Sequence, residues 1–278
     1  MFVMGIDAGN YDTKVCTEQT AKSFPSDIGE YRERKLTDNF SNDDIIWEYN
    51  NEKGFAGTLA RYESEFGGTI KGKTKANKDA VLRVLIAVHK YGKQNNNIVI
   101  GQPIDAHYDT EKNKLKDMLK GKHIIKVNGA EKELIISNVE IAPEGASSIL
   151  SNPVKGLIRI IDIGSGTTNF ATLYNLKRVD KGSFTEQIGT EITRNKEPKE
   201  MANKLHRIIS ANWDNNDTIF LTGGGAEKVI SYLKETYNNC SILKPRLNNS
   251  ILSTRYSNAV AFYIIAKGLY SNEEKEVN

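Results

Sequence analysis

One short pattern occurs twice in the chain: an apolar strand that runs through Ile-Asp into a turn containing glycine. The copies lie at 5–15 and 160–170, and a Thr follows the Asp by six residues in each. Their composition predicts a strand, a tight turn and a second strand. Such a turn can direct several backbone N–H groups into one concavity that suits phosphate oxygens. A single copy would also fit a plain hairpin, but two copies favour a fold with two related halves.

A third glycine turn strengthens this interpretation. Gly223, Gly224 and Gly225 follow a short apolar strand at 219–222 and precede an amphipathic stretch that begins at Ala226. Two strand-Asp-turn-strand units followed by a strand-glycine-helix unit predict a nucleotide held between the two halves.

The order of these motifs resembles that of the actin-like ATPase superfamily, which includes actin, sugar kinases and heat-shock chaperone ATPases. Within it, the chain is similar to the bacterial plasmid-segregation actins of the ParM and AlfA kind. The resemblance runs over nearly the whole chain, although it rests on motifs alone outside the turns. It implies an α/β, actin-like (ribonuclease H-like) fold in which two domains enclose an ATP cleft.

The resemblance also implies a division into domains. Domain I would comprise 1–150 and 255–270, with a small subdomain inserted at about 21–77. Domain II would comprise 151–254, and 271–278 would be a flexible charged tail. Larger relatives carry a subdomain IIB before the third turn, where this chain has room for one helix from Pro198 to about Trp213. We expect subdomain IIB to be reduced or absent, as in AlfA.

The three turns supply the expected binding residues. Asp7 and Asp162 would approach a hydrated Mg²⁺, an ion that is held by few carboxylates and keeps most of its waters. Lys14 is the natural cation for the β- or γ-phosphate, and ATP is the expected nucleotide, with GTP as an alternative. The nucleotide-binding set is Gly9, Asn10, Tyr11, Asp12, Lys14, Gly164, Ser165, Gly166, Thr167, Thr168, Gly223, Gly224 and Gly225. Glu200 and Lys204 are candidates for the ribose.

Glu144 is the expected catalytic residue. Pro143 fits the first position of a helix, which would place Glu144 in the first turn. Acidic residues favour that position through the helix dipole, so a purely structural role also explains it. In the resembled family, however, a Glu after Pro at this point orients the water that attacks the γ-phosphate. The position and order of the motif favour the functional role.

Two other segments lead to structural expectations. A helix rich in small residues is expected at 256–268, ended by Gly268 and packed against the Glu144 helix. Lys71, Lys73, Lys75 and Lys78 cluster within eight positions. A solvated loop is the favoured interpretation of this cluster, ahead of a filament contact and of a nucleic-acid site.

Composition narrows the functional classes. The 278 residues carry a net charge of +3, from 38 basic and 35 acidic residues, which is too weak to indicate nucleic acid as the main ligand. Cys16 and Cys240 are the only cysteines and fit a reducing compartment. Neither a secretory signal nor a long apolar stretch is evident, so we expect a cytoplasmic protein without membrane contact.

The resemblance implies a nucleotide-dependent polymerising protein that hydrolyses ATP and forms filaments for plasmid segregation. Its partners would be further copies of itself and a DNA-binding adaptor on centromere-like plasmid DNA, so it would not itself bind a specific DNA sequence. A small-molecule kinase of the same superfold is one alternative, but no further Asp motif suggests an acceptor-activating carboxylate. A filament scaffold with negligible ATPase activity is the other.

Overall fold

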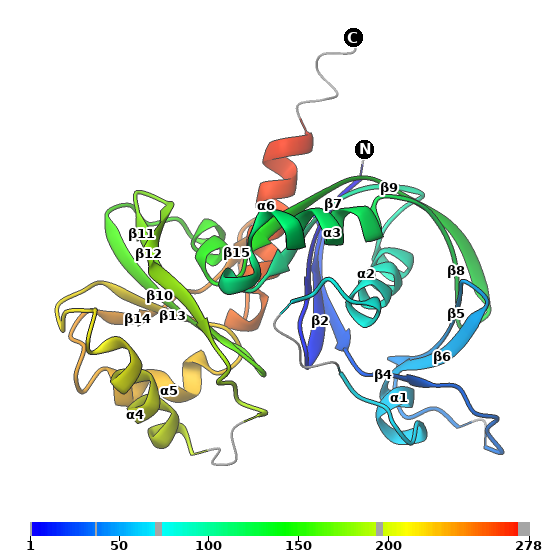
Figure 1. The fold of residues 1–278 in the computed structure, drawn as a ribbon, viewed down its shortest axis with the longest axis horizontal. Helices are drawn as coiled ribbons and strands as arrows, with labels where there is room; N and C mark the ends of the chain where they lie inside the picture. Colours follow the sequence, from blue (N-terminus) through cyan, green and yellow to red (C-terminus); the bar gives the residue numbers. More distant parts are fainter. Residues whose placement is uncertain (1, 37, 70–73, 193–196, 272–278) are drawn as a thin grey trace, which may run out of the picture.

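The computed structural model describes residues 2–36, 38–69, 74–192 and 197–271. Its strands form two large sheets in separate halves of the molecule, and helix α6 (Ser257–Tyr270) runs between them (Figure 1). Lys71, Lys73 and the predicted tail at 272–278 lie outside the described residues. Within the described ranges, no helix combines the length and the apolar character that a membrane span requires.

The first sheet contains nine strands among the described residues. In sheet order they are β3 (Ala21–Pro25), β2 (Asp12–Cys16), β1 (Phe2–Ala8), β7 (Asn95–Gln102), β9 (Ala130–Pro143), β8 (Gly121–Val127), β5 (Asp44–Tyr49), β6 (Glu52–Gly57) and β4 (Ile28–Glu30). The helices of this half are α1 (Thr58–Glu63), α2 (Lys78–Tyr91) and α3 (Asp109–Leu119), with the 3₁₀ turns η1 (Ile104–Ala106) and η2 (Ala146–Ser151).

The second sheet contains five strands in the described part of the chain. They are, in sheet order, β12 (Lys177–Glu186), β11 (Thr168–Tyr174), β10 (Leu157–Ile163), β13 (Ile219–Thr222) and β14 (Cys240–Ile242). Helices α4 (Pro198–Ile209) and α5 (Ala226–Leu233) belong to this half. A short ribbon of β15 (Arg246–Leu247) and β16 (Ser250–Ile251), then η3 (Thr254–Tyr256), lead into α6.

The two sheets repeat one strand pattern. In the first, β3, β2 and β1 are antiparallel neighbours, and β7 and β9 then continue parallel to β1. In the second, β12, β11 and β10 are antiparallel neighbours, and β13 and β14 continue parallel to β10. The prediction of two related halves is therefore confirmed, because the two Ile-Asp turns occupy the same place in the two sheets.

Alternating side chains of β1 are buried under different helices. Met4 and Ile6 belong to the apolar core that includes α2, whereas Val3 packs with α6 residues. This two-residue period is that of a strand covered on both faces. At Gly5 the backbone of α6 lies so close that an added Cβ would come within 2.1 Å of the Tyr263 nitrogen. Glycine is therefore required here by the close approach of the helix.

Helix α4 is part of the core of the second half. Met201, Leu205 and Ile209, spaced at helical intervals, are buried with residues of α5 and the second sheet. This confirms that α4 is a core element. The reduction of subdomain IIB, relative to larger family members, stays a prediction.

Three local expectations differ from the structure. Pro143 is the last residue of β9, paired with Gln102, and Gly145 has φ 69°, so Glu144 lies in a turn before η2 and the helical first turn predicted for it is wrong. The predicted stop at Gly268 is also wrong, because α6 continues to Tyr270, which packs against the core cluster of Phe262. The sequence predicts one small inserted subdomain at about 21–77. Instead, β3 pairs with β2 and extends the main sheet at one edge, and only β4–β6 and α1 lie at the opposite edge.

The contact at Gly5 leads to a stability prediction. Gly5→Ala should lower the free energy of unfolding by about 3 kcal/mol, since the backbone of α6 must move to admit the methyl group. Gly268→Ala is the matched control on α6 itself, since an added Cβ there meets no atom within 4 Å. This substitution should raise the free energy of unfolding by about 0.5–1 kcal/mol. Urea denaturation followed by circular dichroism measures both, and equal midpoints for the two variants would contradict the prediction.

Candidate functional site

A pocket lies between the two halves, where the turn after β1 meets the turn after β10. Twelve of the residues predicted from the sequence line it: Asp7, Gly9, Asn10, Lys14, Glu144, Asp162, Gly164, Ser165, Gly166, Thr167, Gly223 and Gly224. The two turns are in close contact, since a Cβ added to Gly166 would lie 2.8 Å from the Asn10 side-chain nitrogen. The structure thus brings the three glycine turns and Glu144 to one site.

The remaining predicted residues lie just outside this pocket. Tyr11 is 47% exposed and lies under the Arg61 guanidinium, 5.1 Å from its ring centroid. Asp12 forms an ion pair with Arg255. Gly225 caps α5, and its N–H donates to the Ile163 carbonyl. None of these three residues lines the pocket.

The repeated Thr is structural in both halves. The buried Thr168 hydroxyl donates to the Ile188 carbonyl at 2.8 Å, and the buried Thr13 hydroxyl is 2.9 Å from that of Ser26. Each hydrogen bond joins the second strand of a hairpin, β2 or β11, to the segment that follows the next strand, β3 or β12. Thr168 therefore does not line the pocket, although the sequence predicted a nucleotide contact.

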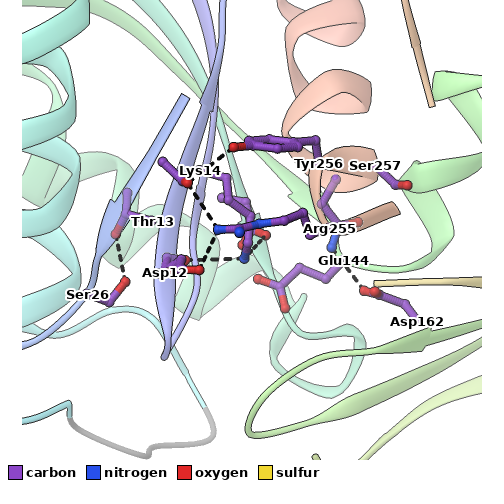
Figure 2. Close-up of polar contacts among 12 residues, drawn as sticks. Asp12, Thr13, Lys14, Ser26, Glu144, Asp162, Arg255, Tyr256 and Ser257 are labelled. Carbon is purple, nitrogen blue, oxygen red and sulfur yellow. Dashed lines mark hydrogen bonds and ion pairs between the residues drawn. The ribbon is translucent and has the colours of Figure 1, made fainter. Parts of the chain in front are cut away.

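The first half contributes a buried set of charges. Asp7 forms ion pairs with Lys14 and Lys75, each at 3.2 Å, and Lys75 also contacts the Glu144 carboxylate. Figure 2 shows Lys14 beside the β1–β2 hairpin, with Glu144 and Asp162 toward the second half. Burial alone would raise the pKa of Asp7, but the two ammonium groups outweigh it and lower the pKa. Asp7 is therefore ionised at neutral pH.

Asp162 has a different environment. Its carboxylate accepts hydrogen bonds from the side-chain amides of Asn258, at 2.9 Å, and Asn169, at 3.5 Å. Burial raises the pKa of Asp162 to about 6, and the Asn258 hydrogen bond only partly opposes this. The negative charges of Glu144 and Asp7 act in the same direction as burial.

The strand register explains why the two aspartates differ. In the β1–β2 hairpin Asp7 is paired with Lys14, and in the β10–β11 hairpin Asp162 is paired with Asn169. These partners are equivalent positions of the repeated pattern, seven residues after each Asp. The first half therefore places a cation beside its aspartate, whereas the second places a neutral amide there.

Glu144 is held rigidly at the boundary between the halves. Its backbone N–H donates to the Gln102 carbonyl, and the N–H of the next residue, Gly145, donates to the Asn258 side chain. The side chain is 8% exposed, and burial raises the pKa of Glu144, against the effect of the Lys75 ammonium. A carboxylate with a raised pKa is a better proton acceptor than one in water.

Sequence reasoning missed several residues that line the pocket, among them Lys75, Asn258 and Arg255. Lys75 was assigned to a solvated loop, which is wrong, since its side chain is only 13% exposed and contacts two carboxylates. Asn258 and Arg255 lie in or just before a helix that was interpreted as packing alone. Glu200 and Lys204, the ribose candidates, lie exposed on α4 and do not line the pocket.

The residues present fit a hydrated magnesium ion. Among the described residues no three His, Cys, Asp or Glu side chains are grouped as a protein-only metal site would require. Mg²⁺ is usually held by one or two carboxylates together with phosphate oxygens and water. Asp162, with a raised pKa caused by burial and by neighbouring negative charge, is a carboxylate that a cation would stabilise.

Comparison with known proteins agrees with this geometry. Residues 5–146, just over half of the chain, match the family model described as actin-like proteins, N-terminal domain. The chain belongs to the actin-like protein family. None of the curated proteins matches it significantly.

Solved structures of actin-like proteins share the whole fold. An AlfA filament bound to AMPPNP is 23% identical, with coverage of 99% of this chain and 98% of the other and a TM-score of 0.76. The filament of AlfA from B. subtilis plasmid pLS32 is 22% identical, with coverage of 95% and 98% and a TM-score of 0.77. The archaeal actin homologue Ta0583 in complex with ADP is 18% identical, with coverage of 96% and 100% and a TM-score of 0.76. The fold of this actin-like chain is therefore the two-domain α/β fold that its sequence predicted.

The raised pKa of Asp162 predicts a pH dependence of stability in metal-free buffer. Its folded pKa of about 6 exceeds the ordinary value of 3.8, so the folded state binds more protons between these values. The contribution of Asp162 to the free energy of unfolding therefore falls as pH rises from about 4 to 6 and stays low above that. Asp162→Asn should remove this fall and be more stable than the natural protein at pH 7 by about 2–3 kcal/mol. Denaturation with EDTA from pH 4.5 to 7.5 measures the difference, and a difference independent of pH would contradict it.

Proposed function

We propose that this chain is a nucleotide-dependent polymerising protein that binds and hydrolyses ATP and forms filaments for plasmid segregation. The observation that carries the proposal is the buried set of three carboxylates and two ammonium groups, Asp7, Glu144, Asp162, Lys14 and Lys75, between two glycine turns. Burying charged groups is costly even when they are paired, and such groups cluster at functional sites. Their place at the junction of two halves suits a ligand that both halves grip.

The nucleotide would lie with its phosphates between the two turns. Backbone groups at Gly9, Asn10 and 164–167 would bind the phosphate oxygens, and Lys14 would supply a cation for the β- or γ-phosphate. Gly224 leaves room for the base, since an added Cβ there meets no atom within 4 Å. The AMPPNP and ADP in the structures of the two relatives support an adenine nucleotide.

Asp7 and Asp162 would hold a hydrated Mg²⁺ from opposite halves. When bound, the ion would neutralise phosphate charge as hydrolysis proceeds. Asn258 orients the Asp162 carboxylate toward the pocket, and Lys14 keeps Asp7 ionised.

Glu144 would orient the attacking water and accept its proton. Its raised pKa suits this role, and its fixed backbone holds the carboxylate at the end of the cleft. Phosphoryl transfer depends mainly on positioning and on charge stabilisation, so one well-placed acceptor is sufficient.

The filament and its cargo rest on the relatives. AlfA is a filament in two structures of the same fold, which supports self-association of this chain. The net charge of +3 is small for a protein that binds DNA itself, which supports a separate adaptor on the plasmid DNA. The proposal places the filament in the cytoplasm, away from membranes.

Polymerisation tests the proposal directly. Purified protein with Mg²⁺ should scatter light at right angles and pellet above a threshold concentration with ATP or AMPPNP, because both bind the two halves together. With ADP, or without nucleotide, it should stay in the supernatant. Hydrolysis by a protein that stays monomeric under all conditions would contradict the filament and favour a small-molecule kinase.

Glu144→Ala tests the hydrolytic step. Turnover should fall about 10²- to 10³-fold through loss of the proton acceptor. Affinity for AMPPNP, measured by titration calorimetry, should change less than about threefold. Glu140→Ala is the control, since Glu140 lies on β9, four residues before Glu144, but pairs with Lys116 at the surface. Equal turnover in both variants would reduce Glu144 to a structural residue and favour the scaffold with negligible ATPase activity.

A further inference from the structure

Lys75 is a second, largely buried lysine in the cleft, beside Lys14. Its ammonium lies 3.2 Å from Asp7 and contacts Glu144, and its side chain is 13% exposed. Holding a charged lysine here costs solvation free energy, which the two carboxylates offset. A lysine side chain is ordinarily charged at neutral pH, and here its ammonium lies between two carboxylates.

The backbone that carries Lys75 is fixed by side-chain hydrogen bonds. Its N–H donates to the side chain of Gln102 at 2.8 Å, and that side chain donates in turn to Thr74 at 3.1 Å. Asn77, two residues later, caps α2 by accepting from the Ala80 N–H. The backbone on both sides of Lys75 is thus held by side-chain hydrogen bonds, and the four-carbon side chain of Lys75 extends from it into the pocket.

Lys14 and Lys75 occupy different positions along the cleft. Lys14 is tied to the β1–β2 turn, with its ammonium on Asp7 and on the Asp12 carbonyl. Lys75 lies between Asp7 and Glu144. Because Glu144 is the residue proposed to orient the attacking water, the ammonium in contact with it lies nearest the phosphoryl group that the water attacks.

We propose that Lys75 binds the terminal phosphate of a nucleoside triphosphate and is the residue by which the cleft distinguishes a triphosphate from a diphosphate. The inference rests on the proposed function and extends it to the specificity of the same site. On binding, the ammonium exchanges one carboxylate contact for oxygens of the terminal phosphate, which are more highly charged. A diphosphate has no group at that position, so Lys75 stays with its carboxylates.

Lys75→Met tests the assignment, because it keeps the length and apolar stem of the side chain and removes the charge. Affinities for AMPPNP and ADP, both with Mg²⁺, are measured by titration calorimetry, which requires no turnover. The variant should bind AMPPNP about 10- to 100-fold more weakly and ADP within about twofold of the natural protein. Lys75→Arg should recover part of the preference. Lys78→Met is the matched control, since Lys78 is exposed and pairs with Glu52.

A double variant separates contact with phosphate from neutralisation of Glu144. The variant Lys75→Met/Glu144→Gln leaves no unpaired Glu144 carboxylate in the cleft. If it binds AMPPNP weakly but ADP as the natural protein does, the result supports contact between Lys75 and the terminal phosphate. Restored binding of AMPPNP in the double variant would overturn it, as would equal losses for AMPPNP and ADP or no loss for either in Lys75→Met. If the natural protein binds neither nucleotide, the proposed function fails and the inference with it. A cooperative thermal unfolding transition of each variant in the presence of ADP confirms that it is folded.

Discussion

The attachment of α6 to both halves is the contact on which the geometry of the cleft depends. The body of the helix lies against β1, where only glycine at position 5 admits it. Its first residues are bound to the second half, through Ser257 to Thr222 and through Asn258 to Asp162. One rigid helix therefore fixes the distance between the two hairpins. Helix α6 joins the halves, and its Asn258 also donates a hydrogen bond to Asp162. The two aspartates can therefore face one pocket.

The two halves share a strand order but differ in charge, and the difference lies in a single register position. Lys14 and Asn169 are equivalent partners of Asp7 and Asp162. The Lys14 ammonium lowers the pKa of Asp7. The Asn169 amide carries no charge, so burial raises the pKa of Asp162. Lys75 adds a second cation to the first half. A symmetric fold thus presents an asymmetric site, with both lysines among the carboxylates of the first half and an aspartate without a charged partner in the second.

Patterns of composition predicted the two halves, the three turns and the core role of α4, since each depends on a period or a turn that a short stretch contains. Lys75 could not be predicted, because its burial depends on Gln102, 27 residues away, and a lysine run resembles a solvated loop. The pairing of Arg255 with Asp12 spans 243 positions. Glu144 lines the pocket, and its role there stays a prediction. Its backbone was predicted as helical because Pro143 suits a strand end and a helix start equally well.

The asymmetry of charge determines how a metal nucleotide would be oriented. Phosphate oxygens would be attracted to Lys14 and Lys75 in the first half, and a divalent cation to Asp162 in the second, which lacks a charged partner. A nucleotide bound in this way would be attracted by both halves at once. Loss of the terminal phosphate would remove the group proposed to lie nearest Lys75 and Glu144, so the attraction would weaken on the side of the first half. Because α6 fixes the distance between the two halves at one end of the cleft, the remaining change would be a rotation of one half relative to the other. Hydrolysis would in this way alter the surface that each subunit presents to its neighbours.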